Sequence, residues 1–229
     1  MFAFKHLFQS SQLLLDSDLD NLCAHGKALE KDPRGIKVVQ LKNGDILKIF
    51  RARNLFSATR LYSHARRFCR NAERLAVRNI PTVRIKNLYH FKTNNSAAVL
   101  YSPLEGKTLS QLIHEESFDL NLAEKLGDFL TELHQKGIHF HSLHTGNIVQ
   151  TSEGHLGLID ISDLTIYAWP LFCSTRVRSF KRLCRNKDDI KKLGLTFWNA
   201  FQDRYFEKSQ LTKRCMKKIR QVNSELIKF

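Results

Sequence analysis

The first clear pattern of apolar and polar positions is a pair of strand-like segments joined by a tight turn. Residues 36–41 and 45–50 are mostly apolar and flank Asn43-Gly44, the dipeptide that most strongly favours a two-residue β-hairpin loop. In the second segment, Lys48 shares one strand face with two large apolar residues. This lysine is interpreted either as an edge-strand residue whose ammonium reaches solvent or as a cation that binds phosphate.

A helical pattern follows over residues 57–79. Apolar residues recur there at steps of three and four, which predicts an amphipathic helix with one buried stripe: Leu61, Ala65, Phe68, Ala72 and Leu75. The rest of this helix is rich in arginine, and Glu73 is the only carboxylate between Asp45 and Glu105. Glu73 therefore either pairs with Lys48 or forms a weak intrahelical pair with Arg70, one turn earlier.

Two more strands are predicted at residues 82–91 and 97–101, before a break at 102–106. After the break, Thr108 is placed to cap a short helix, and a longer helix over 122–136 ends at Gly137. Residues up to about 31 fit either a helix or an irregular strand.

Beyond about residue 175 the chain is predicted to form two or three basic helices. The sequence thus predicts an α+β chain in two parts. A β-rich first part covers residues 1–101, and a mainly helical second part covers 107–229.

Residues 137–164 hold the most informative chemistry. Asn147 directly precedes one apolar strand, Asp160 ends a second, and the turn Ser152-Glu153-Gly154 joins the two strands. A hairpin of this kind brings the asparagine and the aspartate side by side at one end.

Composition narrows the class of protein. The chain has 229 residues, 42% of them hydrophobic, which is enough for a packed core. It shows no apolar run of the roughly 18 residues that a membrane span needs, and no secretory signal is evident. The five cysteines are scattered and form no C-x-x-C pair, so a reducing cytoplasm is expected, without a disulfide framework or zinc site. The ten histidines lack metal-ligand spacing, and His139, His141 and His144 are interpreted as polar loop residues.

The net charge of +15 predicts anionic partners. Basic residues concentrate at 51–86 and 176–192, inside the apparent domain and not in a tail. Phospholipid headgroups, phosphorylated sugars and nucleic acid all fit this charge, and so does a merely solvated surface. No helix-turn-helix, zinc-finger or RNP signature supports nucleic acid, so none is expected.

The order of these motifs over about residues 35–200 resembles the small lipopolysaccharide-core kinases, the Kdo and heptose kinases of Gram-negative bacteria. These enzymes belong to the protein-kinase-like superfamily. The resemblance is sharpest in residues 137–164 and extends to Ile80-Pro81-Thr82-Val83. It implies a bilobal protein-kinase-like fold, with residues 1–101 as a β-rich N-lobe, 102–106 as the hinge, and 107–229 as the C-lobe.

The resemblance also implies roles for individual residues. Lys48 matches the strand lysine that contacts ATP phosphates, and Glu73 matches its partner on the helix. Asn147 and Asp160 match the two magnesium ligands, with Asp160-Ile161-Ser162 in place of D-F-G. Residues 100–104 would face the adenine. ATP and Mg²⁺ are the implied cofactors.

The chain departs from the family pattern in three places. No G-x-G-x-x-G precedes the lysine strand, and no A-P-E follows Asp160. The position of the catalytic-base aspartate is Ser142, in Phe140-His141-Ser142-Leu143-His144-Thr145-Gly146-Asn147. Asp163 is the leading replacement carboxylate, with His141 and His144 as alternatives. Loss of a general base typically costs 10²–10⁴-fold in rate, so it slows a kinase without abolishing it.

The function implied is an ATP-dependent kinase that phosphorylates a sugar of the lipopolysaccharide inner core. Its acceptor would be a lipid-anchored anionic glycan at an anionic membrane surface. The protein would therefore be cytoplasmic and peripheral to the inner membrane. The alternative is a pseudokinase of the same fold that binds nucleotide and serves as a scaffold in envelope biogenesis.

Overall fold

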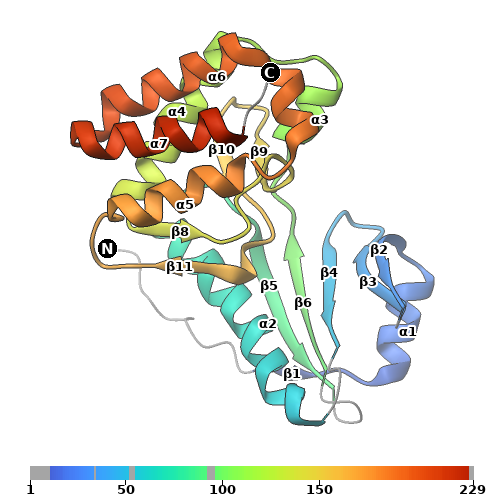
Figure 1. Cartoon of the computed structure of the whole chain (residues 1–229). Helices are drawn as coiled ribbons and strands as arrows, with labels where there is room; N and C mark the ends of the chain where they lie inside the picture. Colours follow the sequence, from blue (N-terminus) through green and yellow to red (C-terminus); the bar gives the residue numbers. More distant parts are fainter. Residues whose placement is uncertain (1–10, 34, 52–54, 92–95, 227–229) are drawn as a thin grey trace. The chain divides into compact units, whose positions relative to one another are not determined.

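The computed structural model describes residues 11–33, 35–51, 55–91 and 96–226, without the side chains of 16, 20, 55–63 and 225–226. The chain forms two compact units, Met1–Leu104 and Glu105–Phe229 (Figure 1). The division falls inside the predicted 102–106 segment. The predicted α+β class is confirmed. Within the described residues, no helix is both long and apolar enough to cross a membrane.

The first unit is built on a six-stranded sheet with the order β1-β5-β6-β4-β3-β2. Its strands are β1 (Gln12–Leu13), β2 (Lys27–Asp32), β3 (Gly35–Gln40), β4 (Ile46–Phe50), β5 (Arg84–His90) and β6 (Ala97–Ser102). All pairings are antiparallel except that of β1 with β5. Helix α1 (Asp16–Ala24) separates β1 from β2. The N-terminal region thus holds both a helix and strands.

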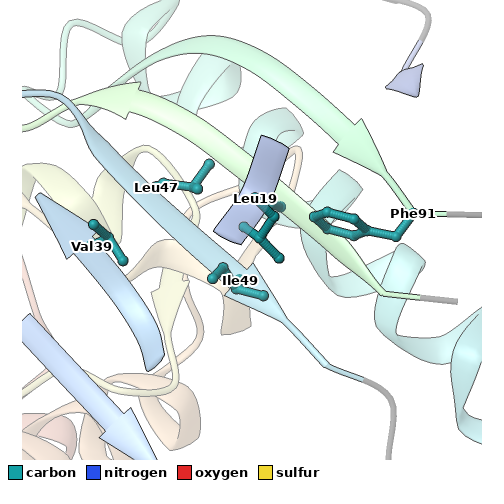
Figure 2. Close-up of a cluster of buried hydrophobic side chains, with 6 residues drawn as sticks. Leu19, Val39, Leu47, Ile49 and Phe91 are labelled. Atoms are coloured by element: carbon teal, nitrogen blue, oxygen red, sulfur yellow. The ribbon is translucent and has the colours of Figure 1, made fainter. Parts of the chain in front are cut away.

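One face of this sheet carries the core cluster of the unit (Figure 2). Leu47 and Ile49 of β4 pack there with Leu19 of α1 and with Val39 and Phe91, and all five side chains are buried. Because side chains alternate along a strand, Lys48 lies on the opposite face. Helix α1 therefore covers the face that Lys48 does not occupy.

The opposite face packs against α2 (Leu55–Ala76). Ala65, Phe68, Ala72 and Leu75 are at most 3% exposed, which confirms the described part of the predicted apolar stripe. The ring of Phe68 lies between those of Phe50 and Tyr101, with centroids 6.3 Å and 5.3 Å away. Burial of these aromatic rings holds α2 on the sheet.

The predicted hairpin around Asn43-Gly44 is confirmed, but its loop has three residues, 42–44, and not the predicted two. The amide of Leu41 donates to the carbonyl of Asp45 at 2.8 Å, and Gly44 has the positive φ (85°) that favours glycine. The buried Asp45 carboxylate accepts from Lys86 at 2.6 Å and from Ser102 at 3.1 Å. Hydrogen bonding to Lys86 is the main cause that lowers the pKa of Asp45. One carboxylate thus fastens the hairpin to β5 and β6.

The second unit begins with β7 (Lys107–Thr108), α3 (Leu109–His114) and α4 (Leu120–Gln135). Thr108 and Gln111 form a capping box at α3, as the sequence predicts for Thr108. Gly137 follows the end of α4 with φ 72°, which confirms its role as a helix terminator. The helices α5 (Cys173–Leu183), α6 (Lys187–Ser209) and α7 (Lys213–Leu226) complete the predicted helical region.

A buried polar network ties α4, α5 and α6 together. The hydroxyl of Tyr205 on α6 lies 2.7 Å from Nδ1 of His134 on α4 and accepts from Arg176 of α5 at 3.2 Å. Burial is the main cause that lowers the pKa of His134 well below its usual range, so this imidazole is neutral.

The prediction that the cysteines form no disulfide is wrong. Cys173 at the start of α5 and Cys215 on α7 are disulfide-bonded, while Cys23, Cys69 and Cys184 are free thiols. The two bonded residues are 42 positions apart, and they meet because α5 and α7 pack together. A crosslink over that separation stabilises a fold by about 4 kcal/mol in the chain-entropy description.

Candidate active site

The predicted hairpin in the second unit is confirmed. Strands β9 (Ile148–Gln150) and β10 (Leu156–Leu158) are antiparallel, and Ile148 is paired with Leu158. One step further, the amide of Ile159 donates to the carbonyl of Asn147 at 3.1 Å. Asn147 and Asp160 are therefore neighbours at the same end of the hairpin, as the sequence predicts.

Asn147 is buried and fixed by the loop that precedes it. Its amide nitrogen donates to the carbonyl of Ser142 at 2.9 Å and lies 3.0 Å from Nε2 of His144. The amide oxygen is then the atom through which Asn147 can bind a metal. Asp160 is exposed and has left-handed backbone angles (φ 51°, ψ 47°), which aspartate tolerates better than most residues.

Ser142 and Asp163 are brought together although 21 residues separate them. The Ser142 hydroxyl donates to Oδ2 of Asp163 at 2.5 Å. Asp163 belongs to the 3-10 turn η2 (Ile161–Asp163), directly after Asp160, which places it next to the loop. A carboxylate thus lies within hydrogen-bond distance of Ser142.

The second oxygen of Asp163 is buried and lacks a hydrogen-bond partner among the described residues. Buried carboxylate oxygens are normally hydrogen-bonded, because desolvation without a partner costs free energy.

A second carboxylate of this unit, Asp189, anchors the loop and was missed by the sequence analysis. It lies in the first turn of α6, is fully buried, and accepts from the hydroxyl of Thr145 at 2.5 Å. Its other oxygen lies 3.3 Å from Nε2 of His114. Thr145 belongs to η1 (Thr145–Asn147), so Asp189 holds the turn that contains Asn147. Acidic residues are common in the first turn of a helix because they interact favourably with the helix dipole. The sequence alone therefore does not distinguish Asp189 from an ordinary residue at a helix start.

The histidines near the loop are engaged by protein groups. Arg182 lies with Nη1 3.0 Å from Nε2 of His139 and 3.1 Å from Nδ1 of His141. An arginine can only donate, so both ring nitrogens accept and both rings are neutral. Burial is the main cause that lowers the pKa of His139 to about 4, followed by His141 and then Arg182. His139 lies in the strand β8 (Ile138–Phe140), so the interpretation as loop residues is wrong for this histidine.

Lys48 and Glu73 belong to the first unit. Lys48 is 7% exposed, and its Nζ lies 5.6 Å from the ring centroid of Phe68, a cation–π contact with α2. Glu73 lies on α2, and burial raises the pKa of its carboxyl. A cation in contact would lower that pKa instead, so the pairing of Lys48 with Glu73 stays a prediction.

The chemistry of Asn147 and Asp160 fits magnesium. Both offer oxygen ligands, and Mg²⁺ commonly takes one or two protein ligands while phosphates and waters supply the others. Within the described parts of the chain, no group of three or more His, Cys, Asp or Glu side chains is arranged to hold a metal. Neither the scan against known protein families nor the search of curated proteins finds a match to this chain.

Proposed function

We propose that this protein is a kinase-like phosphotransferase that uses ATP and Mg²⁺ to phosphorylate a sugar hydroxyl of the lipopolysaccharide inner core. In this proposal the two compact units correspond to the two lobes of a protein-kinase-like fold. Asn147 and Asp160 would bind the metal, Lys48 would contact the phosphates of ATP, and Glu73 would be the partner of Lys48. The sugar acceptor follows from the resemblance drawn from the sequence.

The observation that carries the proposal is the local arrangement around the hairpin. Two candidate metal ligands, Asn147 and Asp160, are neighbours at one end of the hairpin, and Asp163, which has one oxygen without a partner among the described residues, follows Asp160 by three positions. Phosphoryl transfer asks mainly for positioned charges around the phosphate and for a group that orients the acceptor. This end of the hairpin offers both.

In the reaction, Asp163 is the general base. A carboxylate oxygen of Asp163, once exposed by a local movement, would accept the proton of the acceptor hydroxyl. The oxygen of that hydroxyl would bond to the γ-phosphorus while the bond between the γ-phosphorus and the β–γ bridging oxygen breaks. ADP leaves and the sugar phosphate is formed. Ser142 is a positioning residue, because its hydroxyl donates to the other oxygen of Asp163 and fixes the carboxylate plane.

Mg²⁺, when bound, neutralises the charge that develops on the phosphates. Asn147 is already oriented for it, since the amide nitrogen is held by the carbonyl of Ser142. Asp189 keeps the same turn in place through Thr145. These contacts pre-arrange the metal ligand and so lower the cost of assembling the site.

A small or glycan acceptor fits this chain better than a protein substrate. After η2 the chain forms the short strand β11 (Leu164–Ile166), and α5 begins at Cys173. Six residues thus separate the strand from the helix, which is too few for the long segment that binds peptides in protein kinases.

The base assignment is tested by three variants, after circular dichroism shows each to be folded. Asp163→Asn keeps the shape of the side chain, and we expect kcat to fall about 10²–10⁴-fold while the Kd for ATP is unchanged. Ser142→Ala should lower kcat about tenfold and shift the pH profile, and Ser142→Thr should restore both because it keeps the hydroxyl. The control is Asp203→Asn, an exposed carboxylate on α6. An Asp163→Asn variant with normal kcat would refute the role of Asp163.

Ser142 also favours the second candidate, a pseudokinase scaffold. A chain without an aspartate at this position could bind nucleotide without transferring phosphate. In that case ATP and Mg²⁺ would raise the melting temperature of the protein, but no acceptor would be phosphorylated. Asp160→Asn would abolish the thermal shift in both cases, so phosphate transfer itself separates the two candidates.

A further inference from the structure

A cluster of exposed aromatic side chains lies between β11 and α5. Tyr167, Trp169 and Phe172 are 36%, 53% and 69% exposed, and Phe172 is the most exposed large hydrophobic residue in the described part of the chain. Single exposed apolar residues are common on protein surfaces, whereas a cluster usually marks an interaction site. Three such residues within six positions therefore indicate an interaction surface.

The segment that carries these rings is held firmly by its backbone. The amide of Tyr167 donates to the carbonyl of Gly137 at 2.9 Å, and the amide of Leu171 donates to that of His134 at 2.8 Å. Arg176 donates to the carbonyl of Leu171 at 2.8 Å. The fold thus presents the aromatic rings outward while it buries Leu171.

Basic residues lie directly beside the aromatic cluster. Phe172 precedes Cys173, which is disulfide-bonded to Cys215 with 5.8 Å between their Cα atoms. The residues next to Cys215 are Lys213, Arg214 and Lys217, all exposed. Figure 1 shows α5 and α7 side by side. Neither residues 173–187 nor 213–224 contain a carboxylate, so the charge of this surface is wholly positive.

We propose that Tyr167, Trp169, Phe172, Lys213, Arg214 and Lys217 form a surface that docks on an anionic phospholipid bilayer. We call it the aromatic-basic surface. Tryptophan and tyrosine favour the headgroup level of membranes, phenylalanine inserts further, and each nearby lysine or arginine adds about 1 kcal/mol at an anionic surface. Apolar rings beside uncompensated cations match that interface.

Other partners fit this surface less well. A second copy of the chain would bring two positive surfaces together in a symmetric dimer, which is repulsive. Single-stranded nucleic acid also combines stacking with positive charge. However, residues 166–173 contain no charged or amide side chain, and Ala168 and Pro170 are exposed as well. A continuous apolar tip fits a lipid boundary better than it fits separate bases.

This surface lies outside both basic regions that the sequence analysis identified, 51–86 and 176–192. Arg176, inside the 176–192 region, is 5% exposed and is used within the fold. The inference deepens the proposed function, because docking on a bilayer would bring the enzyme to a lipid-anchored acceptor. In that respect it rests on the proposed function. Binding to vesicles, however, needs no catalysis, so the two can fail separately.

The test uses vesicles of phosphatidylcholine alone or mixed with phosphatidylglycerol, some of them with brominated acyl chains. The chain has two tryptophans, of which Trp198 is 2% exposed, so quenching by brominated lipid reports on Trp169. We expect quenching only with phosphatidylglycerol present, and its loss in Trp169→Phe, whose remaining Trp198 is buried. Phe172→Ser and the pair Lys213→Gln with Arg214→Gln should each weaken cosedimentation about tenfold or more.

Matched controls are Leu195→Ser, which removes a side chain 55% exposed on α6, and Lys187→Gln with Lys191→Gln, which removes two exposed cations at the start of α6. We expect these controls, and the catalytically impaired Asp163→Asn, to bind vesicles normally. Equal binding to neutral vesicles, absence of binding, or unchanged binding by Phe172→Ser would overturn the inference. So would preferential binding of an oligonucleotide in competition with vesicles, or a dimer that Phe172→Ser dissociates.

Discussion

At the scale of single residues, the structure separates the three candidates for the missing base. Nδ1 of His141 faces Arg182, and its other nitrogen lies 3.2 Å from the hydroxyl of Thr165. The nitrogens of His144 face the amide of Gly146 and the side chain of Asn147. Asp163 retains an oxygen without a partner among the described residues. This difference, which depends on contacts across 21 residues, favours Asp163 and is invisible in the sequence.

His139 gives a prediction about the pH dependence of stability. Its folded pKa is about 4, below the ordinary value of 6.5, mainly because it is buried. Below pH 6.5 this histidine binds a proton in the unfolded chain but not in the folded chain. The free energy of unfolding therefore falls as the pH drops from 6.5 to 4. The loss from this residue is on the order of 3 kcal/mol.

The variant His139→Gln removes the titration and keeps an acceptor for Arg182. Urea unfolding between pH 7.5 and 4 should therefore show a smaller loss of stability in this variant than in the wild type. His155→Gln, at an exposed histidine of the β9–β10 turn, is the control and should follow the wild type. If the free energy of unfolding fell equally with pH in His139→Gln and in the wild type, the assigned pKa would be contradicted.

At the scale of elements, the sequence predicts most of what the structure contains. Local signals gave the Asn43-Gly44 hairpin, the stripe of α2, the Thr108 cap and the β9–β10 hairpin, because each depends on neighbours in the chain. The disulfide between Cys173 and Cys215 and the contact of Asp189 with Thr145 were not predicted. Both depend on how helices pack, and scattered residues carry no local sign of that packing.

Gly137 offers a test of how closely the end of α4 packs against residues 167–172, the segment that carries the exposed aromatic rings. It has φ 72°, and a Cβ there would lie 2.6 Å from the carbonyl oxygens of both Tyr167 and Trp169. Gly137→Ala should therefore destabilise the protein through backbone strain and a clash that only backbone movement relieves. Gly154→Ala has a similar φ of 81° but meets only the flexible end of Lys125.

We expect Gly137→Ala to lower the free energy of unfolding by about 2 kcal/mol more than Gly154→Ala does. Denaturant unfolding of both variants measures this difference. Equal losses would mean that the close approach of the aromatic segment to Gly137 does not constrain the fold.

At the scale of the whole molecule, the protein combines a net charge of +15 with two compact units and one cluster of candidate catalytic groups. The sequence predicted anionic partners from the charge alone, but it could not say which cations are exposed. The structure buries Arg176 and leaves the cations at the start of α7 accessible. Charge therefore gives the class of partner, and packing gives the surface.

The most direct test of the central claim is transfer of labelled γ-phosphate from ATP to dephosphorylated lipopolysaccharide core, measured with and without Mg²⁺. The account predicts transfer that requires both the metal and the glycan, and that Asp160→Asn abolishes while the exposed Asp203→Asn does not. ATP binding without transfer to any core acceptor would contradict a kinase and leave the scaffold as the function.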